Sequence, residues 1–239
     1  MYEPRFYQSD FIKEWFSLKV AVSETDLLVK SKLPLEESSV VFLVKKFRKE
    51  IEDYILKHGK FKTALFPLPA EQPCPRIVYE MAEKSSLAGV GPMASVAGAV
   101  AEFLGRELIP KSPELLVENG GDIFIKKQGN IKLSLYAGKG SFVNGLTFLI
   151  ENKDGETGIC SSSSFLGHSL SFGNADLTTV ISPSAVFADA LATKLANMVH
   201  GEEDVGKALE FAKSFSLTRG VLAVKGEKIG IWGDIQIGK

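Results

Sequence analysis

The polar residues best suited to chemistry lie in a stretch of the chain that is otherwise largely apolar. Asp189, Thr193 and Asn197 stand four residues apart, so a helix over 185–200 would place all three on one face. Most other residues of this segment are Ala, Val, Phe, Leu and Met, which predicts a buried helix, and a buried carboxylate needs a partner. A carboxylate and a hydroxyl one turn apart offer two hard oxygens that suit Mg²⁺ shared with a phosphate. The spacing leaves equally open a structural carboxylate that binds backbone amides or pairs with a lysine.

Two adjacent glycines form a second candidate element, in the sequence Glu118-Asn119-Gly120-Gly121-Asp122. Glycine adopts positive φ without strain and lets a ligand approach the backbone closely. The same spacing is also typical of a tight hairpin turn between two strands. Asp122 could fix this turn or act near a metal.

Hydroxyl groups are concentrated after Cys160, in Ser161, Ser162, Ser163 and Ser164, and Gly167-His168-Ser169 follows. No strand, Gly-x-Ser-x-Gly and helix pattern is present, which disfavours a serine hydrolase. A loop that offers hydroxyls and amides to a polar ligand fits better. The segment Gly89–Ala94 matches a dinucleotide-binding pattern, but a helix precedes it where that pattern requires a strand. We expect instead a helix beginning at Pro92, whose N-terminus could receive a phosphate or simply pack closely.

These candidates must be positioned by a mixed set of helices and strands. Strands in runs with helices between them predict an α+β fold, mainly antiparallel sheet packed with helices, and not a doubly wound parallel sheet. The expected helices are Glu36–His58, Ile77–Lys84, Pro92–Phe103, Ala185–His200 and Val205–Phe215, and residues 60–75 are expected to be extended. The expected strands are 16–22, 27–29, 115–118, 122–126, 131–136, 143–150, 158–161, 177–181, 221–224 and 228–237.

Composition narrows the class of protein. The 239 residues carry a net charge of −1 with 45% hydrophobic residues, so we expect one folded domain over 1–239 and no nucleic-acid partner. Charge is uneven: residues 85–101 carry none, and 157–193 carry only Asp176 and Asp189. Such segments are buried or approach a ligand, and neither is long and apolar enough to predict a membrane partner. Two cysteines, three histidines and no secretory signal predict no disulfide framework or zinc cluster, and a cytoplasmic location. Small-residue faces are compatible with a homodimer.

Taken in order along the chain, these segments resemble the ApbE-like superfamily, whose best-known members are FAD:protein FMN transferases. The resemblance rests on the small-residue helix 91–102, the turn 117–123, the serine region and Ala188–Thr193. It is closer still to an uncharacterised, non-secreted branch found in archaea and some bacteria. The motifs similar to that branch are Arg5–Tyr7, Glu24–Leu27, Val90–Ala94, Gly167–Gly173 and Trp232-Gly233.

This resemblance implies a single ApbE-like domain that binds FAD or a related nucleotide, with Mg²⁺ as a second cofactor. The implied binding residues are Pro92, Met93, Ala94, Asn119, Gly120, Gly121, Asp122, Ser161, Ser162 and Ser163, and the implied metal ligands are Asp189 and Thr193. Transfer of a flavin or nucleotidyl group, or pyrophosphate cleavage, would follow, with an acceptor protein that the sequence does not identify.

The chain departs from the transferases at two places. No lysine occurs from Ser85 to Ala101, where the transferases carry Lys-Gly-Tyr, and 166–176 lacks their His-x-x-Asp-Pro segment. The sequence therefore supports two further hypotheses: a non-catalytic flavin- or nucleotide-binding protein that has lost transferase activity, and a structural partner with an empty site.

Overall fold

The computed structural model describes residues 14–138, 140–152, 155–163 and 174–238 of the chain. Its helices are α1 (Glu37–Lys57), α2 (Lys60–Thr63), α3 (Arg76–Ala88), the short 3₁₀ helix η2 (Pro92–Ser95), α4 (Val96–Leu108), α5 (Ala185–Met198) and α6 (Asp204–Lys213). Its strands are β1 (Phe16–Val22), β2 (Thr25–Ser31), β3 (Leu115–Asn119), β4 (Asp122–Lys126), β5 (Ile131–Ser134), β6 (Thr147–Ile150), β7 (Glu156–Ser162), β8 (Leu177–Ser182), β9 (Gly220–Lys225), β10 (Lys228–Gly233) and β11 (Ile235–Ile237).

One large sheet organises the molecule. It contains eight strands in the order β1-β2-β3-β4-β7-β8-β9-β10, and every neighbouring pair is antiparallel. Strands β5 and β6 leave this order and join β11 in a second sheet of three strands. The α+β expectation is therefore confirmed, and the central departure from a simple meander is the β5–β6 segment between the paired strands β4 and β7.

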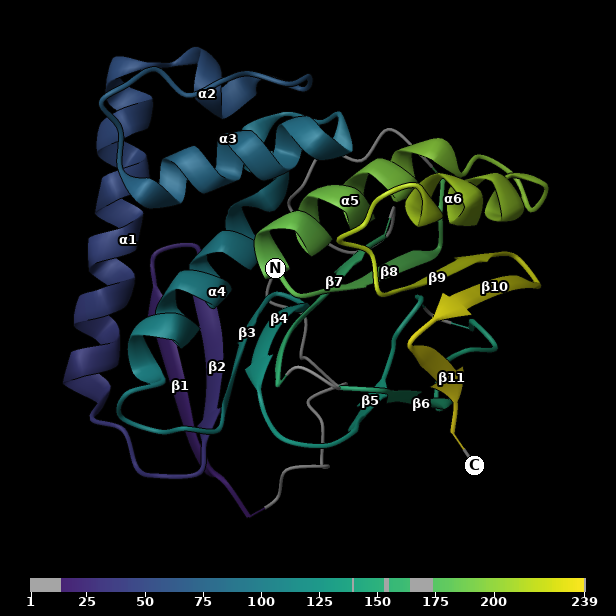
Figure 1. Cartoon of the computed structure of the whole chain (residues 1–239), viewed down its shortest axis with the longest axis horizontal. Helices are drawn as coiled ribbons and strands as arrows, with labels where there is room; N and C mark the ends of the chain where they lie inside the picture. Colours follow the sequence, from purple (N-terminus) through teal and green to yellow (C-terminus); the bar gives the residue numbers. More distant parts are fainter. Residues whose placement is uncertain (1–13, 139, 153–154, 164–173, 239) are drawn as a thin grey trace.

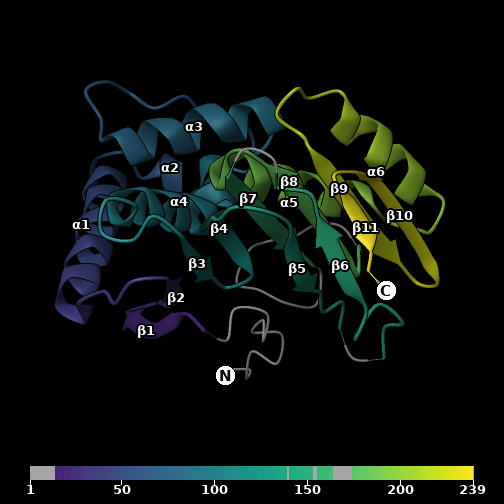
Figure 2. The same ribbon diagram turned by 60° about the horizontal axis from the view of Figure 1, so that its bottom comes forward.

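The two faces of the large sheet are covered by different partners (Figure 1). Because side chains alternate along a strand, Val117 and Phe124 pack toward the helices, while their neighbours Leu116 and Ile125 pack toward the small sheet. Figure 2 shows the same layers from another side, with α3, α4, α5 and α6 over one face and β5, β6 and β11 on the other. The sheet is thus buried on both sides, by two separate apolar clusters.

Helix α5 lies at the centre of the helical layer. It is largely apolar apart from the face that carries Asp189 and Thr193, and it is buried between strands β7 and β8 on one side and helices α3 and α4 on the other. Its first turn is capped twice, because the hydroxyl of Ser184 accepts from the N–H of Phe187, and Glu102 accepts from the N–H of Val186 at 3.1 Å. These caps hold the N-terminal end of α5 against α4.

Several ends of the expected elements shift by a few residues, and four differences matter most for the fold. Residues 60–63 form the short helix α2 within a segment that we expected to be extended, and the helix at Pro92 begins as 3₁₀ turn η2. The expected strand 143–150 starts only at Thr147. The expected strand 228–237 bends at Gly233 and divides into β10 in the large sheet and β11 in the small one. The ion pair of Arg219 with Asp234, at 3.0 Å, stabilises this bend.

No single helix in the described part of the chain is long and apolar enough to cross a membrane. The segments Arg76–Ala88 and Pro92–Leu108 would be long and apolar enough only when taken together, and they meet at an angle of 101°.

Candidate functional site

Asp189 lies where helix α5 crosses helix α4. The N–H of Gly98 donates to Oδ2 of Asp189 at 2.8 Å. A Cβ at position 98 would lie 2.3 Å from the carbonyl oxygen of Ala185 and 2.8 Å from the Cβ of Asp189. Glycine is therefore required at this crossing, and its backbone, exposed by the missing side chain, orients the carboxylate.

The two-glycine turn brings a second carboxylate to the same place. Asn119 and Asp122 are paired at the ends of β3 and β4, and the intervening glycines have φ of +67° and +104°. The side-chain amide of Asn119 donates to the carbonyl oxygen of Ala97 at 3.1 Å, next to Gly98. An oxygen of Asp122 accepts from the N–H of Ser161 at 3.3 Å. The turn, the start of α4 and the serine strand β7 thus meet beside Asp189.

The two carboxyl groups perturb each other. Asp122 and Asp189 are only 7% and 8% exposed. Burial raises the pKa of Asp189 from 3.8 to about 7, against the opposing effect of the Gly98 and Ala97 N–H groups. Burial, and then the negative charge of Asp189, raises the pKa of Asp122 well above its ordinary value. The buried pair therefore favours a protonated carboxyl group or a nearby cation over two unbalanced negative charges.

Thr193 completes the expected metal pair one turn along α5 and is likewise buried. Within the described ranges no group of three or more His, Cys, Asp and Glu is arranged to hold a metal ion. The donor set nevertheless fits Mg²⁺, because this ion binds through one or two carboxylates and completes its shell with water and ligand phosphates. Asp189 and Thr193 would hold it, with Asp122 beside them.

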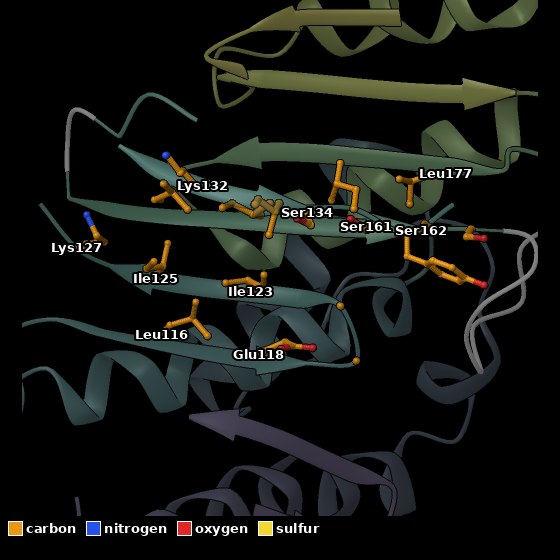
Figure 3. A pocket seen from close by; sticks show the side chains of 18 of the residues that line it. Leu116, Glu118, Ile123, Ile125, Lys127, Lys132, Ser134, Ser161, Ser162 and Leu177 are labelled. Carbon is orange, nitrogen blue, oxygen red and sulfur yellow. The ribbon is translucent and has the colours of Figure 1, made fainter. Parts of the chain in front are cut away.

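A cavity of about 460 Å³ opens on the other side of the two-glycine turn. It lies between the large sheet and strand β5, on the face away from the helices (Figure 3). Large apolar side chains form its walls, namely Leu116, Ile123, Ile125, Ile131, Leu133, Leu135, Ile159 and Leu177. Its size and apolar lining are typical of a site for a small molecule, which commonly measures about 300–1,000 Å³.

Part of the polar lining of this cavity consists of residues that the sequence had indicated. Gly120, Gly121, Ser161, Ser162 and Ser163 all line it. The hydroxyl of Ser161 shares a hydrogen bond of 2.9 Å with that of Thr179. Ser164 and the expected motif 167–173 lie outside the described residues.

Alternation along β3 and β4 explains why the candidate residues separate onto two faces. Asn119 and Asp122 lie two residues from Val117 and Phe124 and therefore point to the helix-covered face. Glu118 and Ile123 alternate with them and point to the cavity. The two glycines connect these faces, and a Cβ at either would meet no atom of the described residues within 4 Å. A ligand in the cavity can therefore pass over the turn toward Asp122 and Asp189.

The expected helix start at Pro92 lies away from the cavity. Pro92, Met93 and Ala94 form η2 and do not line the cavity, and the carbonyl of Pro92 accepts from the Ser95 hydroxyl at 2.9 Å. The residues of this region that reach Asp189 are instead Ala97 and Gly98. Sequence reasoning noted the close packing of this helix without identifying which glycine allows it.

Comparison with known proteins identifies the family of this chain. A family model described as "AbpE bacteria" matches residues 9–216. The chain is 39% identical over 228 residues to UPF0280 protein MJ1526 of Methanocaldococcus jannaschii, with 92% of each chain covered. It is 35% identical over 224 residues to UPF0280 protein MK0206 of Methanopyrus kandleri, covering 91% of this chain and 90% of that protein.

Solved structures share the fold at much lower sequence identity. Flavin Transferase ApbE from Vibrio cholerae superposes with a TM-score of 0.59 at 14% identity, covering 92% of this chain and 96% of that one. The apo form of the Pseudomonas stutzeri flavinyl transferase ApbE gives a TM-score of 0.60 at 13% identity, with coverage of 91% and 93%. The expected resemblance is confirmed: this chain has the ApbE fold and belongs, with the archaeal UPF0280 proteins, to the ApbE-like family described as "AbpE bacteria".

Proposed function

We propose that this protein binds FAD or a related nucleotide with Mg²⁺ and cleaves or transfers at its diphosphate. One observation carries the proposal: the apolar cavity ends at the two-glycine turn, and the buried Asp122–Asp189 pair lies directly behind that turn. A ring system in the cavity would place its phosphates over Gly120 and Gly121. Relatives in fold are flavin transferases by name, which is consistent with this ligand class.

Each residue of the site has a defined part in this proposal. Asp189, oriented by the N–H of Gly98, and Thr193 would hold the metal ion. Bound Mg²⁺ would neutralise charge on a departing phosphate oxygen. Asp122, fixed by the N–H of Ser161, would keep the turn closed beside it. The glycines would allow the phosphates to approach the backbone, and the serine hydroxyls would donate to the ligand.

The proposed reaction can be written as hydrolysis or as transfer. In cleavage, the oxygen of water bonds to one phosphorus, the bridging P–O bond breaks, and FAD yields FMN and AMP. In transfer, a hydroxyl of an acceptor protein replaces water, so FMN becomes bound through phosphate and AMP departs. In both forms the proton of the attacking hydroxyl leaves to solvent.

A second candidate function is binding without turnover. The observation that favours it is the absence of lysine between Ser85 and Ala101, where the transferases carry one. Such a protein would hold or deliver a flavin or nucleotide. It would use the same cavity and the same turn, so binding is common to both proposals and turnover separates them.

The decisive experiment uses purified protein, FAD and MgCl₂, with chromatography of the products. We expect FMN and AMP to form, and we expect Asp189→Asn and Thr193→Val to abolish their formation. Asp53→Asn, an exposed aspartate of α1, is the matched control and should keep full activity. Tight FAD binding without products would support the second candidate. Absence of FAD binding, with and without Mg²⁺, would overturn both.

A further inference from the structure

Helix α1 carries an exposed face that the core of the molecule does not use. Figures 1 and 2 both show this helix at one edge of the molecule. Phe42 is 67% exposed and Leu56 is 84% exposed, and Lys49 lies midway between them in the sequence. Because seven residues make almost two turns, these three residues lie on one line along the helix. The line runs opposite the buried stripe of α1, which consists of Val40, Val44, Phe47, Ile51 and Tyr54.

The charges along this line are segregated. Lys45 and Lys46 precede Lys49, and Glu52 and Asp53 follow it. Since Lys45 and Glu52 are seven residues apart, both lie on one side of the line, and Lys46 and Asp53 lie on the other side. The outer face of α1 is therefore apolar at each end, basic in its first half and acidic in its second half.

This order is self-complementary when two copies of the helix run antiparallel. A two-fold axis perpendicular to α1 at Lys49 places each residue opposite the residue of the second copy that lies equally far beyond Lys49. Phe42 then packs against the partner's Leu56, because each lies seven residues from the axis. Symmetry repeats this contact, so both exposed apolar side chains of each copy are covered.

The same axis brings opposite charges together. Lys45 faces the partner's Glu52 and Lys46 faces the partner's Asp53, each with an offset of one residue, or about 1.5 Å along the helix. A parallel pair of helices would instead place lysine beside lysine and carboxylate beside carboxylate. Like charges in contact are unfavourable, so the charges select the antiparallel arrangement.

The ion pairs within each copy are compatible with this contact. Arg48 donates to Oε1 of Glu52 at 2.7 Å, and a carboxylate can accept further hydrogen bonds from a lysine of the partner. The two Lys49 side chains meet at the axis, but the carboxylate of Asp53 lies 2.9 Å from the Lys49 ammonium of its own copy and offsets the charge.

We propose that this face binds a second copy of the chain, with the two α1 helices packed antiparallel about Lys49. A single helix-to-helix contact from Phe42 to Leu56, about 21 Å long, buries less than the roughly 1,600 Å² of a standard interface. The dimer is therefore weak, and it is sensitive to salt because its ion pairs lie at the surface. None of these residues lines the cavity, so the inference does not depend on the proposed function.

Sedimentation equilibrium of the whole protein measures this association. We expect the average mass to rise with protein concentration, and the dissociation constant to increase about tenfold from about 50 to about 500 mM NaCl. Lys45→Glu with Lys46→Glu makes the face acidic throughout, whereas Glu52→Lys with Asp53→Lys makes it basic. Each double variant alone should stay monomeric. Mixed together, they should form a heterodimer, because every opposing pair of charges is restored.

A control and a cross-link locate the contact. Lys132→Glu with Lys228→Glu reverses two exposed lysines of β5 and β10, away from α1, and should associate as the native protein does. In a Cys74→Ser background, Lys49→Cys should form disulfide-linked dimers when an oxidant is added, since the two copies of residue 49 meet at the axis. Leu56→Cys would lie about 21 Å from its own copy, too far for a disulfide.

Three results would contradict the proposal. One is a protein that stays monomeric at every concentration up to about 1 mM. Another is self-association of either charge variant with the native dissociation constant. The third is a cross-link at residue 56 without one at residue 49, which would place the axis elsewhere.

Discussion

Neighbouring residues of the same strand have different surroundings, because their side chains point to opposite faces of the large sheet. On the helix-covered face Phe124 is fully buried against Gly105 of α4, and charged groups such as Asp189 and Glu102 are held by backbone N–H donors. On the other face Ile123 borders an open cavity. The difference indicates a rigid layer that positions the carboxylates and a hollow layer that we propose binds the ligand, joined by the two-glycine turn.

The largest expected contrast is between Phe124→Ala and Ile123→Ala. Truncating a fully buried phenylalanine leaves a void among packed helices and should lower the free energy of unfolding by about 3–5 kcal/mol. Ile123 already borders open space, so its truncation should cost about 1 kcal/mol or less. Urea unfolding of both variants measures this difference. Similar losses for the two variants would mean that the cavity-facing layer is packed as tightly as the helical one.

The second contrast concerns pH. Because the pKa of Asp189 is about 7 in the folded protein and near 3.8 when exposed, the folded state keeps a proton that the unfolded chain releases. The stabilisation is complete below pH 4 and is lost as the pH rises through about 7. Without metal, native stability relative to Asp189→Asn should therefore fall by about 4 kcal/mol between pH 4 and pH 8. Urea unfolding of both proteins in a chelator, across this range, tests the prediction, and a constant difference would show that Asp189 is well solvated.

A smaller effect is expected at the crossing of α4 and α5. Gly98→Ala would place a Cβ 2.3 Å from a backbone oxygen that has no freedom to move aside, so we expect a loss of about 1–3 kcal/mol. Gly206→Ala in α6, where an added Cβ meets nothing, is the control and should be neutral or stabilising. Thermal unfolding distinguishes the two. If Gly98→Ala were harmless, the two helices would be able to separate at the metal pair.

The smallest effect on stability is expected at the turn itself. Gly121→Ala strains a backbone with φ of +104° and should cost about 1 kcal/mol, although the added Cβ meets no atom of the residues that the structure describes within 4 Å. Gly120→Asn, at φ of +67°, should cost less because asparagine tolerates this region. Isothermal titration with FAD then sharpens the comparison. A loss of affinity much greater than the loss of stability would place the ligand on the turn, and unchanged affinity would place it elsewhere.

Local patterns in the sequence predicted the elements and the parts of the site that depend on them. Strand-like runs on either side of the paired glycines predicted β3, β4 and their turn, and helical spacing predicted α5 with Asp189 and Thr193 on one face. The charge-poor stretches correspond to buried elements of the core, such as α4 and α5. These features depend on residues close together in the chain.

Non-local features were not predictable in the same way. Strand β4 pairs with β7 and not with the next strands along the chain, β5 and β6. The sequence of neither β4 nor β7 indicates this pairing. The cavity results from that pairing, so it had no local signal in the sequence. Gly98 escaped notice for a similar reason, because its importance comes from Ala185 and Asp189, which are distant in sequence.

The direct pairing of β4 with β7 has an evolutionary consequence. Residues 127–155 form an insertion whose length and composition can change while the register of the large sheet stays the same. This insertion carries one wall of the cavity, but none of the carboxylates behind the turn. Ligand preference in this family can therefore diverge by exchange of a single contiguous segment, without any change in the scaffold that orients Asp122 and Asp189.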